Sequence, residues 1–261
     1  MRIVQLSDLH LVAPGRELFG AEPLARLELA IDDILARHAD ADFCLLTGDL
    51  ADAGGDDAYR ALAAVLARLP VPVRLLPGNH DRRDALRRCL PALPDDGNGF
   101  MQAAHDTPAG RFLLLDTLEP GKPWGSFCTE RRQWLAAQLA AGDEPLFIAM
   151  HHPPFAVGIP SMDQFALRDT EAFWSLIAPQ RARIRHLFLG HLHRPIGGSW
   201  HGIPFSCTSS PNHQVALDLV TTGDDVPGCR EPAGYAVILI DAERVVVHHR
   251  QLFNGENCFW L

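Results

Sequence analysis

The chain has 261 residues, and its 32 acidic and 23 basic side chains give a formal net charge of −9 with histidine neutral. Hydrophobic residues make up 47% and charged residues 21%, which supports a sizeable core and excludes disorder as the main state. The negative charge argues against binding to long nucleic acids, because proteins hold phosphate backbones mainly through clustered Lys and Arg. The compositional oddity is the 13 histidines, several of them in short runs.

The N-terminus and the cysteines indicate the compartment. Asp8 and His10 fall where a signal peptide needs an unbroken apolar core, and no later window approaches the ~18 apolar residues of a membrane span. The six cysteines lie far apart without a CxxC pair, which favours free thiols over disulfides or a zinc-thiolate site. We therefore expect a cytoplasmic protein that has no membrane partner.

Short apolar runs alternate with amphipathic stretches as far as residue 190, which predicts alternating strands and helices. The predicted elements in chain order are strand 3–7, helix 24–38, strand 43–47, helix 57–69, strand 73–77, strand 112–116, helix 130–139, strand 145–150, helix 170–178 and strand 186–190. This alternation is typical of an α/β fold with helices packed outside the sheet.

From Pro195 onward the pattern changes to short strands separated by Gly and Pro turns. The apolar segments are 196–210, 234–241 and 244–253. They predict an antiparallel edge or a second sheet, with 215–233 as an irregular insert.

We expect a catalytic domain over residues 1–215 and a C-terminal extension over residues 216–261. The extension is expected to pack on the core or on a partner subunit, so a homo-oligomer is possible. Four apolar residues of the tail point to the same docking: Phe253, Phe259, Trp260 and Leu261. His248 and His249 in the last strand are expected to be structural or interface residues.

Five junctions between a strand and a loop end in residue types that bind metals. They are SDLH (Asp8, His10), TGDL (Asp49), PGNHD (Asn79, His80), MHHPP (His151, His152) and GHLH (His191, His193). Because ligands of open α/β sheets bind at the carboxyl ends of strands, we expect the five loops to meet in one crevice.

The expected donors are two carboxylates, one amide oxygen and four or five imidazoles, without a thiolate. This set suits Mn, Fe, Zn or Co better than a soft metal. Seven or eight ligands are too many for one ion, so two ions that share one carboxylate are the economical arrangement. Two divalent ions with two carboxylates and a hydroxide leave the site with a charge of about +1, which suits a phosphodiester monoanion. The two ions would also lower the pKa of bound water and so supply a hydroxide nucleophile.

Taken singly, each motif has an ordinary structural explanation. Asp8 or Asp49 at a strand end is a common turn or cap residue, and GNHD alone is typical of a turn. The joint occurrence of the motifs, each after an apolar run, favours the metal site. Asp81, which precedes R-R-D-A-L, is expected to cap a helix rather than to bind metal.

The order D-x-H, G-D, G-N-H-D, H and G-H-x-H resembles the calcineurin-like metallophosphoesterases over residues 1–215. The segments SDLHL, ELFG, PGNHD and MHHPP resemble those of the bacterial class III cyclic-nucleotide phosphodiesterases and the related glycerophosphodiesterases. The resemblance implies a four-layer α/β/β/α sandwich, with the antiparallel segments as its C-terminal extension.

The resemblance also implies a role for each motif residue. Asp8, His10 and His193 would bind the first metal and Asn79, His151 and His191 the second. Asp49 would bridge them. The family pattern favours His151 over His152, which would be structural or lie behind a ligand.

Two further histidines are candidates for contact with the substrate. His80 would face the phosphate, where it would stabilise developing charge or protonate the leaving alkoxide. It could instead orient Asp49 or another ligand. His213, in SSPNHQV, resembles a substrate-pocket histidine of the glycerophosphodiesterases.

The expected function is a metal-dependent phosphodiesterase that hydrolyses small phosphodiesters with activated water. Cyclic nucleotides such as cAMP are favoured as substrates, and glycerophosphodiesters or phosphomonoesters are the alternatives. A metal-free binding scaffold would lack ligands, and none is missing. A nuclease would need a basic track, for which Arg82–Arg88 is the candidate, but a solvated amphipathic helix explains this segment more simply.

Overall fold

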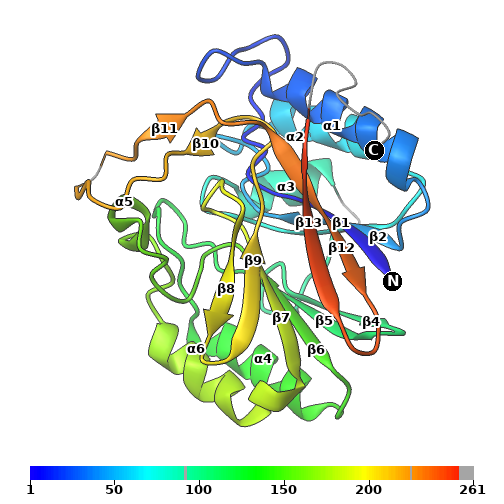
Figure 1. The fold of residues 1–261 in the computed structure, drawn as a ribbon, viewed down its shortest axis with the longest axis vertical. Helices are drawn as coiled ribbons and strands as arrows, with labels where there is room; N and C mark the ends of the chain where they lie inside the picture. The colour runs from blue at the N-terminus through cyan, green and yellow to red at the C-terminus, as the bar shows by residue number, and fades with distance from the viewer. Residues whose placement is uncertain (91–92, 224, 253–261) are drawn as a thin grey trace, which may run out of the picture.

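A computed structural model describes residues 1–90, 93–223 and 225–252. Eleven of its strands form two sheets, and their bounds are Arg2–Leu6 (β1), Phe43–Thr47 (β2), Val73–Leu76 (β3), Ala103–Thr107 (β4), Gly110–Leu115 (β5), Leu146–Met150 (β6), Ile184–Leu189 (β7), Ile196–Trp200 (β8), Ile203–Cys207 (β9), Gly234–Ile240 (β12) and Val245–Gln251 (β13). The first sheet has the order β13-β12-β1-β2-β3 and the second the order β4-β5-β6-β7-β9-β8 (Figure 1). The two sheets lie face to face in the middle of the molecule.

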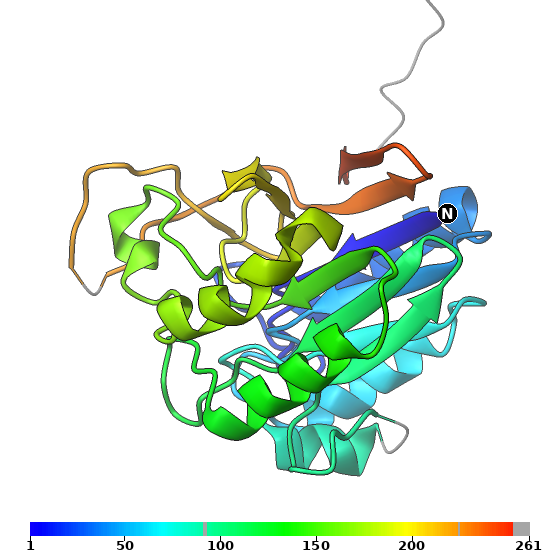
Figure 2. The same ribbon diagram turned by 90° about the horizontal axis from the view of Figure 1, so that it is seen from below.

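Helices cover the outer face of each sheet. The helical elements are Pro23–His38 (α1), Asp56–Leu66 (α2), Arg83–Cys89 (α3), Thr129–Ala140 (α4), Pro160–Asp163 (α5), Thr170–Ile177 (α6) and the 3-10 helix Ala178–Arg183 (η1). Helices α1, α2 and α3 share a core with the first sheet, whereas α4 and α6 share one with the second (Figure 2). A separate two-stranded ribbon, Gln214–Val215 (β10) with Gly228–Cys229 (β11), lies beside the sheets.

Side-chain alternation along the strands builds these layers. In β1, Val4 and Leu6 pack against the helices, while Ile3 faces the second sheet. In β6, Ile148 faces α4 and α6 while Phe147 faces the first sheet. Both faces of the central strands are therefore buried, as their continuous apolar runs require. The predicted four-layer α/β/β/α sandwich is confirmed.

The chain after Pro195 contributes to both sheets. The predicted antiparallel pairing is confirmed, because β8 pairs with β9, and β12 pairs with both β1 and β13. Strand β12 lies between β1 and β13, so residues 234–251 complete the first sheet. The predicted irregular insert, 215–233, contains β11 and the second residue of β10, so the ribbon begins one residue before it. The tail residues Phe253, Phe259, Trp260 and Leu261 lie outside the described residues.

Strand β4 was not predicted from the sequence. Its segment AAHDT has no clear alternation of apolar side chains, and only Ala103 is buried. It forms because the turn before Gly110 folds it back against β5 at the edge of the second sheet. An edge strand depends on such pairing more than on its own pattern.

Within the described part of the chain, Cys44, Cys89, Cys128, Cys207 and Cys229 are free thiols. In the same residues, no helix is both long enough and apolar enough to cross a bilayer.

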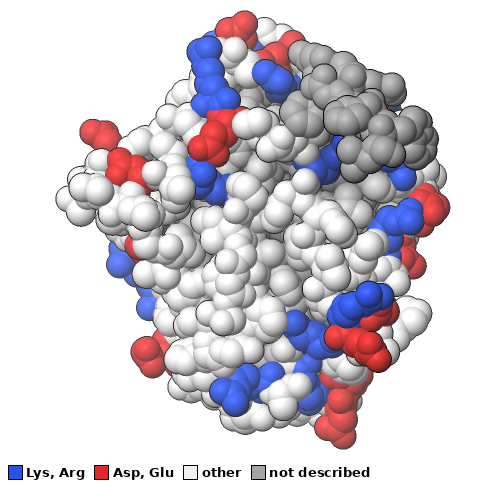
Figure 3. Space-filling view, in the orientation of Figure 1, with Lys and Arg blue, Asp and Glu red and all other residues white. Residues whose placement is uncertain are grey.

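The surface carries both signs of charge in mixed order. In the view of Figure 3, Lys and Arg lie beside Asp and Glu around the rim, and the middle of the described surface is largely uncharged. On α3, Arg88 pairs with Asp84 and Asp56, and Arg82 also pairs with Asp84. The Arg82–Arg88 segment therefore has the paired charges expected of a solvated helix face.

Asp33 of α1 connects the helix layer to the edge of the first sheet through hydrogen bonds. Its carboxylate accepts hydrogen bonds from the Tyr235 hydroxyl at 2.6 Å, from Arg250 Nε and Nη2 at 3.0 Å each, and from Arg37 Nε at 2.8 Å. Burial alone would raise the pKa of Asp33, but these donors hold it below its usual range. The carboxylate is therefore more stable in the folded chain than in the unfolded one.

We expect Asp33→Ala to lower the free energy of unfolding at pH 7 by about 1–3 kcal/mol, because several donors lose a charged acceptor. Since the folded pKa lies below the unfolded value of about 3.9, this contribution is present above that pH and is lost as the pH falls towards the folded pKa. Urea unfolding of wild type and Asp33→Ala, from pH 7 down to the folded pKa, measures the difference in the free energy of unfolding. Asp32→Ala, at an exposed residue bonded to Arg68, is the control and should cost under about 1 kcal/mol. Equal losses would contradict the assignment.

Candidate metal centre

The predicted ligands come together at the carboxyl ends of five strands drawn from both sheets. They follow β1 (Asp8, His10), β2 (Asp49), β3 (Asn79), β6 (His151) and β7 (His191, His193). Six of the seven are buried, and Asn79 is partly buried. The sequence prediction of one crevice therefore agrees with where these side chains lie.

The backbone at the site is held in an unusual conformation. Seven non-glycine residues among those described have a left-handed φ, and five of them are predicted ligands: Asp8 (57°), His10 (46°), Asp49 (51°), His191 (70°) and His193 (49°). Such a backbone costs free energy and persists where the surrounding structure enforces it, often at functional sites. Here it occurs at both ligands of the first loop, Asp8 and His10, and at both ligands of the last, His191 and His193.

Two motif glycines are required by close approach. A Cβ on Gly78 would overlap the Asp49 carboxylate and its backbone nitrogen. A Cβ on Gly190 would overlap the Thr47 carbonyl and the Ser7 hydroxyl. The glycines of GNHD and GHLH therefore let loops from different strands pack side by side at the site.

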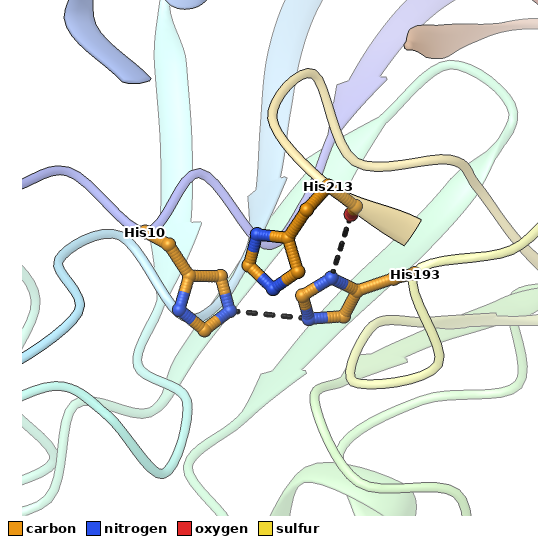
Figure 4. A group of neighbouring side chains, drawn as sticks. All are labelled: His10, His193 and His213. Carbon is orange, nitrogen blue, oxygen red and sulfur yellow. Dashed lines mark hydrogen bonds between the residues drawn. The ribbon is translucent and has the colours of Figure 1, made fainter. Parts of the chain in front are cut away.

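One cluster consists of Asp8, His10, Asp49 and His193, which each place a ligand atom within 4.8 Å of the others. His10 Nε2 lies 3.1 Å from His193 Nε2 and 3.5 Å from Asp49 Oδ2; a dashed line joins the His10 and His193 rings in Figure 4. His193 Nε2 lies 3.6 Å from Asp8 Oδ1. Two nitrogens bound to one ion at about 2.1 Å each lie about 3 Å apart at a right angle, so these spacings fit a shared cation.

A second cluster adjoins the first through Asp49. Asn79 Oδ1 lies 3.1 Å from His151 Nε2 and 3.1 Å from His191 Nδ1. Asp49 Oδ2 lies 3.3 Å from His151 Nε2, while its distance to His10 Nε2 in the first cluster is 3.5 Å. One carboxylate oxygen thus stands between two sets of nitrogen and oxygen donors. Such donors suit divalent first-row ions.

Hydrogen bonds fix which ring nitrogen faces the crevice. His151 Nδ1 donates to the Thr47 carbonyl at 2.8 Å, and His193 Nδ1 donates to the His213 carbonyl at 3.0 Å. Each bond leaves Nε2 as the ring nitrogen that faces the crevice, as partners of metal-binding histidines commonly do. Asp8 Oδ2 is buried and has no hydrogen-bond partner among the described residues, which fits a carboxylate shaped for a cation.

The electrostatics favour positive charge between the two clusters. Burial alone would raise the pKa of Asp49, but the imidazoles of His151, His80 and His10 hold it well below its usual range. Burial would lower the pKa of His151, but Asp49 and Asp8 raise it to about 9. A cation that binds through His151 must displace a proton, so its affinity increases with pH.

His80 and His213 line a cavity of about 820 Å³ that opens from the two clusters. The backbone N–H of His80 donates to Asp49 Oδ1 at 2.9 Å, and its ring Nδ1 donates to the Asp52 carbonyl at 2.7 Å. The His213 ring centroid lies 4.9 Å from that of His10 and 4.6 Å from that of His193 (Figure 4). Both candidates therefore border the crevice.

His152 lies behind the predicted ligands. It is fully buried, its Nδ1 is 2.7 Å from the Thr117 hydroxyl, and its ring centroid is 4.8 Å from that of His191. One of its ring nitrogens lies within 4.8 Å of a ring nitrogen of His151 and of His191. The contact with Thr117 gives His152 a structural role.

The prediction that Asp81 caps a helix is wrong. Helix α3 begins at Arg83, its N-cap is Arg82, and no side chain caps it. Asp81 is buried instead, where it accepts hydrogen bonds from backbone and hydroxyl donors of neighbouring loops. These donors are Leu50 N, Ala51 N, Gly78 N and the Tyr59 hydroxyl. The carboxylate therefore pairs with backbone donors of the neighbouring loops and not with the first turn of α3.

Asp52 is a candidate site residue that was not predicted from the sequence. Its carboxylate accepts a hydrogen bond from His10 Nδ1 at 3.0 Å, and its backbone carbonyl binds His80. It therefore orients two candidate histidines at once. The available signal was a carboxylate three residues after Asp49 on the same loop.

We expect Asp52→Ala to lower the affinity for divalent metal about 10–100-fold, because partners that orient a ligand contribute to this extent. Asp52→Asn keeps an acceptor oxygen and should lose less. Titration of metal-free protein with Mn²⁺, followed by calorimetry, measures both. Asp57→Ala changes an exposed aspartate that pairs with Arg60 and should leave the affinity unchanged. Equal affinities for wild type and Asp52→Ala would show that His10 needs no such partner.

The fold and the donor set are those of a metallophosphoesterase, and comparison with known sequences agrees. The sequence profile of the calcineurin-like phosphoesterases matches residues 1–195. The chain therefore belongs to this family and is a hydrolase of the metallophosphoesterase type, which confirms the resemblance of its motifs.

Among its relatives, a "Probable cyclic nucleotide phosphodiesterase" of Rhodopseudomonas palustris is 43% identical, and the match covers 95% of this chain and 91% of that protein. A "Probable glycerophosphodiester phosphodiesterase" of Arcobacter nitrofigilis is 30% identical, over 84% of this chain and 81% of that protein. The solved structure of a purple acid phosphatase from yellow lupin has a TM-score of 0.66 at 17% identity, over 98% of this chain and 52% of that chain. That likeness concerns the fold.

Proposed function

We propose that the protein is a dinuclear-metal-dependent phosphodiesterase that hydrolyses small phosphodiesters, with 3',5'-cyclic nucleotides such as cAMP as its main substrates. The observation that carries the proposal is the position of Asp49 Oδ2 between two sets of donors at the end of one cavity. In this proposal Asp8, His10 and His193 hold one ion and Asn79, His151 and His191 the other. Asp49 is shared.

The residues would divide the chemistry as follows. When bound, two divalent ions polarise the phosphoryl oxygens and lower the pKa of water, which supplies a nucleophile at neutral pH. His10, His151 and His193 keep Nε2 directed inward through the hydrogen bonds of Nδ1. Asp49 additionally holds the His80 backbone beside the crevice.

His80 is the proposed catalytic residue. Because its Nδ1 donates to the Asp52 carbonyl, its Nε2 carries a proton only in the imidazolium form. That form can both stabilise charge on the phosphate and protonate a leaving alkoxide. His213 borders the same space and is proposed to contact the substrate.

The choice of substrate rests on relatives and on cavity size. The R. palustris relative is named for cyclic nucleotides, and a 31% identical relative of Pseudomonas aeruginosa is named as a cAMP phosphodiesterase, over 74% of this chain and 69% of that protein. A cavity of about 820 Å³ has room for a nucleoside beyond the phosphate. The A. nitrofigilis relative keeps glycerophosphodiesters as the second candidate.

The test uses metal-free protein reconstituted with Mn²⁺ and assayed on cAMP, glycerophosphocholine, bis(p-nitrophenyl) phosphate and p-nitrophenyl phosphate. We expect the diesters to be hydrolysed faster than the monoester. His80→Ala should lower kcat about 10²–10⁴-fold without changing metal content. Protein that binds no metal and hydrolyses none of these compounds would instead be a binding scaffold.

A further inference from the structure

The cavity continues well past the metal centre. Its inner end is formed by predicted ligands such as Asp49 and His193. Its outer end is lined by the loop 18–21, the first turn of α1, the β10–β11 ribbon and residues at α5. The outer end has no part in the proposed chemistry at phosphorus, so it is available to bind the remainder of a substrate.

A continuous row of side chains leads from the metal centre to this outer end. The His213 ring lies beside His10, with centroids 4.9 Å apart, and the Phe19 ring lies 4.7 Å from that of His213. Gly20 follows Phe19, and Arg230 Nη2 lies 3.3 Å from the position of a Cβ on Gly20. A ligand that reaches from the phosphate site along this wall therefore meets an imidazole, a phenyl ring and a guanidinium in turn.

Phe19 is held in place for contact with a ligand. Its φ is 52°, which is rare for a bulky side chain, and its side chain is 70% exposed although it is aromatic. The turn is closed by reciprocal backbone hydrogen bonds between Leu18 and Ala21, at 2.8 and 3.2 Å. An exposed ring on a hydrogen-bonded turn of the cavity wall is a suitable stacking surface for a planar group.

The outer end carries positive charge. Arg26 and Arg230 both line it, and in the described part of the chain neither forms an ion pair with a carboxylate. The acidic residue beside them, Glu231, pairs with Arg194 Nη1 at 3.0 Å. Two guanidinium groups therefore face this space as hydrogen-bond donors.

Apolar side chains line the same cavity, among them Met162 of α5 and the nearby Phe165. A slot with an aromatic surface, apolar side chains and cationic donors suits a flat heterocycle with oxygen or nitrogen acceptors at its rim. It is a poor site for a quaternary ammonium group, which would lose water beside two like charges.

We propose that the outer end is the nucleobase subsite, in which the base stacks on Phe19 and accepts hydrogen bonds from Arg26 and Arg230, and that these two arginines disfavour choline-bearing diesters. The inference rests on the proposed phosphodiesterase function and names the residues that select among its substrates. It assigns the preference for cyclic nucleotides over glycerophosphocholine to charge at the outer end.

The test compares kcat/KM for cAMP with that for bis(p-nitrophenyl) phosphate, which has no base, in the Mn²⁺-loaded enzyme. In Arg230→Ala and Arg26→Ala the ratio of the two values should fall about tenfold or more, through a higher KM for cAMP. Phe19→Ala should lower the ratio in the same way, whereas Phe19→Trp, which retains an aromatic ring, should keep the ratio near the wild-type value. Arg230→Glu should raise the use of glycerophosphocholine relative to cAMP at least about tenfold.

Arg16→Ala is the matched control, because Arg16 is exposed on the same N-terminal loop and does not line the cavity. It should leave both activities unchanged. An unchanged ratio in the Arg26 and Arg230 variants would overturn the inference, as would a wild type that hydrolyses bis(p-nitrophenyl) phosphate but not cAMP.

Equilibrium binding separates this inference from the proposed function. Calorimetry with AMP and Mn²⁺-loaded protein should show about tenfold weaker binding in Arg26→Ala and Arg230→Ala than in wild type and Arg16→Ala. If wild type hydrolyses no diester, the proposed function fails, and this series still decides the subsite. Equal AMP affinities, or no AMP binding by wild type, would overturn the inference.

Discussion

Asp49→Asn is expected to lower phosphodiesterase activity by at least about 100-fold and to leave the protein with less bound metal. Asp49 Oδ2 lies close to donors of both clusters, 3.5 Å from His10 Nε2 and 3.3 Å from His151 Nε2. Replacing even a residue that only orients a ligand costs 10–100-fold in metal affinity or activity. The loss of a shared carboxylate removes a negative charge that both ions would otherwise share.

The amide retains the size of the carboxylate and can still accept the hydrogen bond from His80 N, so the fold should be preserved. Metal content after reconstitution and equilibrium dialysis, together with kcat on bis(p-nitrophenyl) phosphate, measures the effect. Asp106→Asn is the control, because Asp106 is an exposed residue of β4 paired with Arg111. Full metal content with full activity in Asp49→Asn would refute the shared-ligand role.

The candidate site residues that could be predicted from the sequence are those that directly follow a predicted strand. Each ligand motif follows a buried strand, so the position of Asp8 or Asp49 along the chain already places it at a strand end. The carboxyl ends of neighbouring parallel strands lie at one edge. That rule does not require knowledge of contacts between distant side chains.

The parts that the sequence could not give depend on such distant contacts. Asp81 resembles a cap in its local context, yet its carboxylate binds backbone donors some 30 residues earlier, at Leu50 and Ala51. Arg26 and Arg230 share one cavity although more than 200 residues separate them. The place of strand β12 in the first sheet, between β1 and β13, likewise depends on its pairing with distant strands and not on its own sequence pattern.

Asp81→Ala is expected to have the largest effect on stability, a loss of at least about 3 kcal/mol in the free energy of unfolding. The carboxylate accepts hydrogen bonds from Gly78 N at 2.8 Å, from Leu50 N and Ala51 N at 3.1 Å, and from the Tyr59 hydroxyl at 2.9 Å. Each buried donor left without an acceptor costs about 1–3 kcal/mol, and more when its partner was charged. Asp81→Asn keeps one acceptor oxygen and should lose less. Asp84→Ala, at an exposed aspartate of α3, should change the free energy of unfolding much less than Asp81→Ala does, because exposed ion pairs contribute little.

Asp81→Ala should also weaken metal binding, although it replaces none of the predicted metal ligands. Gly78 and Leu50 are the immediate neighbours of Asn79 and Asp49, so Asp81 ties together the two loops that carry these side chains. Metal that binds the folded state adds a stability that increases with its affinity. Urea unfolding with and without saturating Mn²⁺ measures how much the metal raises the free energy of unfolding. This increase should be smaller in Asp81→Ala than in wild type. An equal gain in both would mean that Asp81 stabilises the fold but does not position the ligands, because the metal would then hold the two loops equally well in either protein.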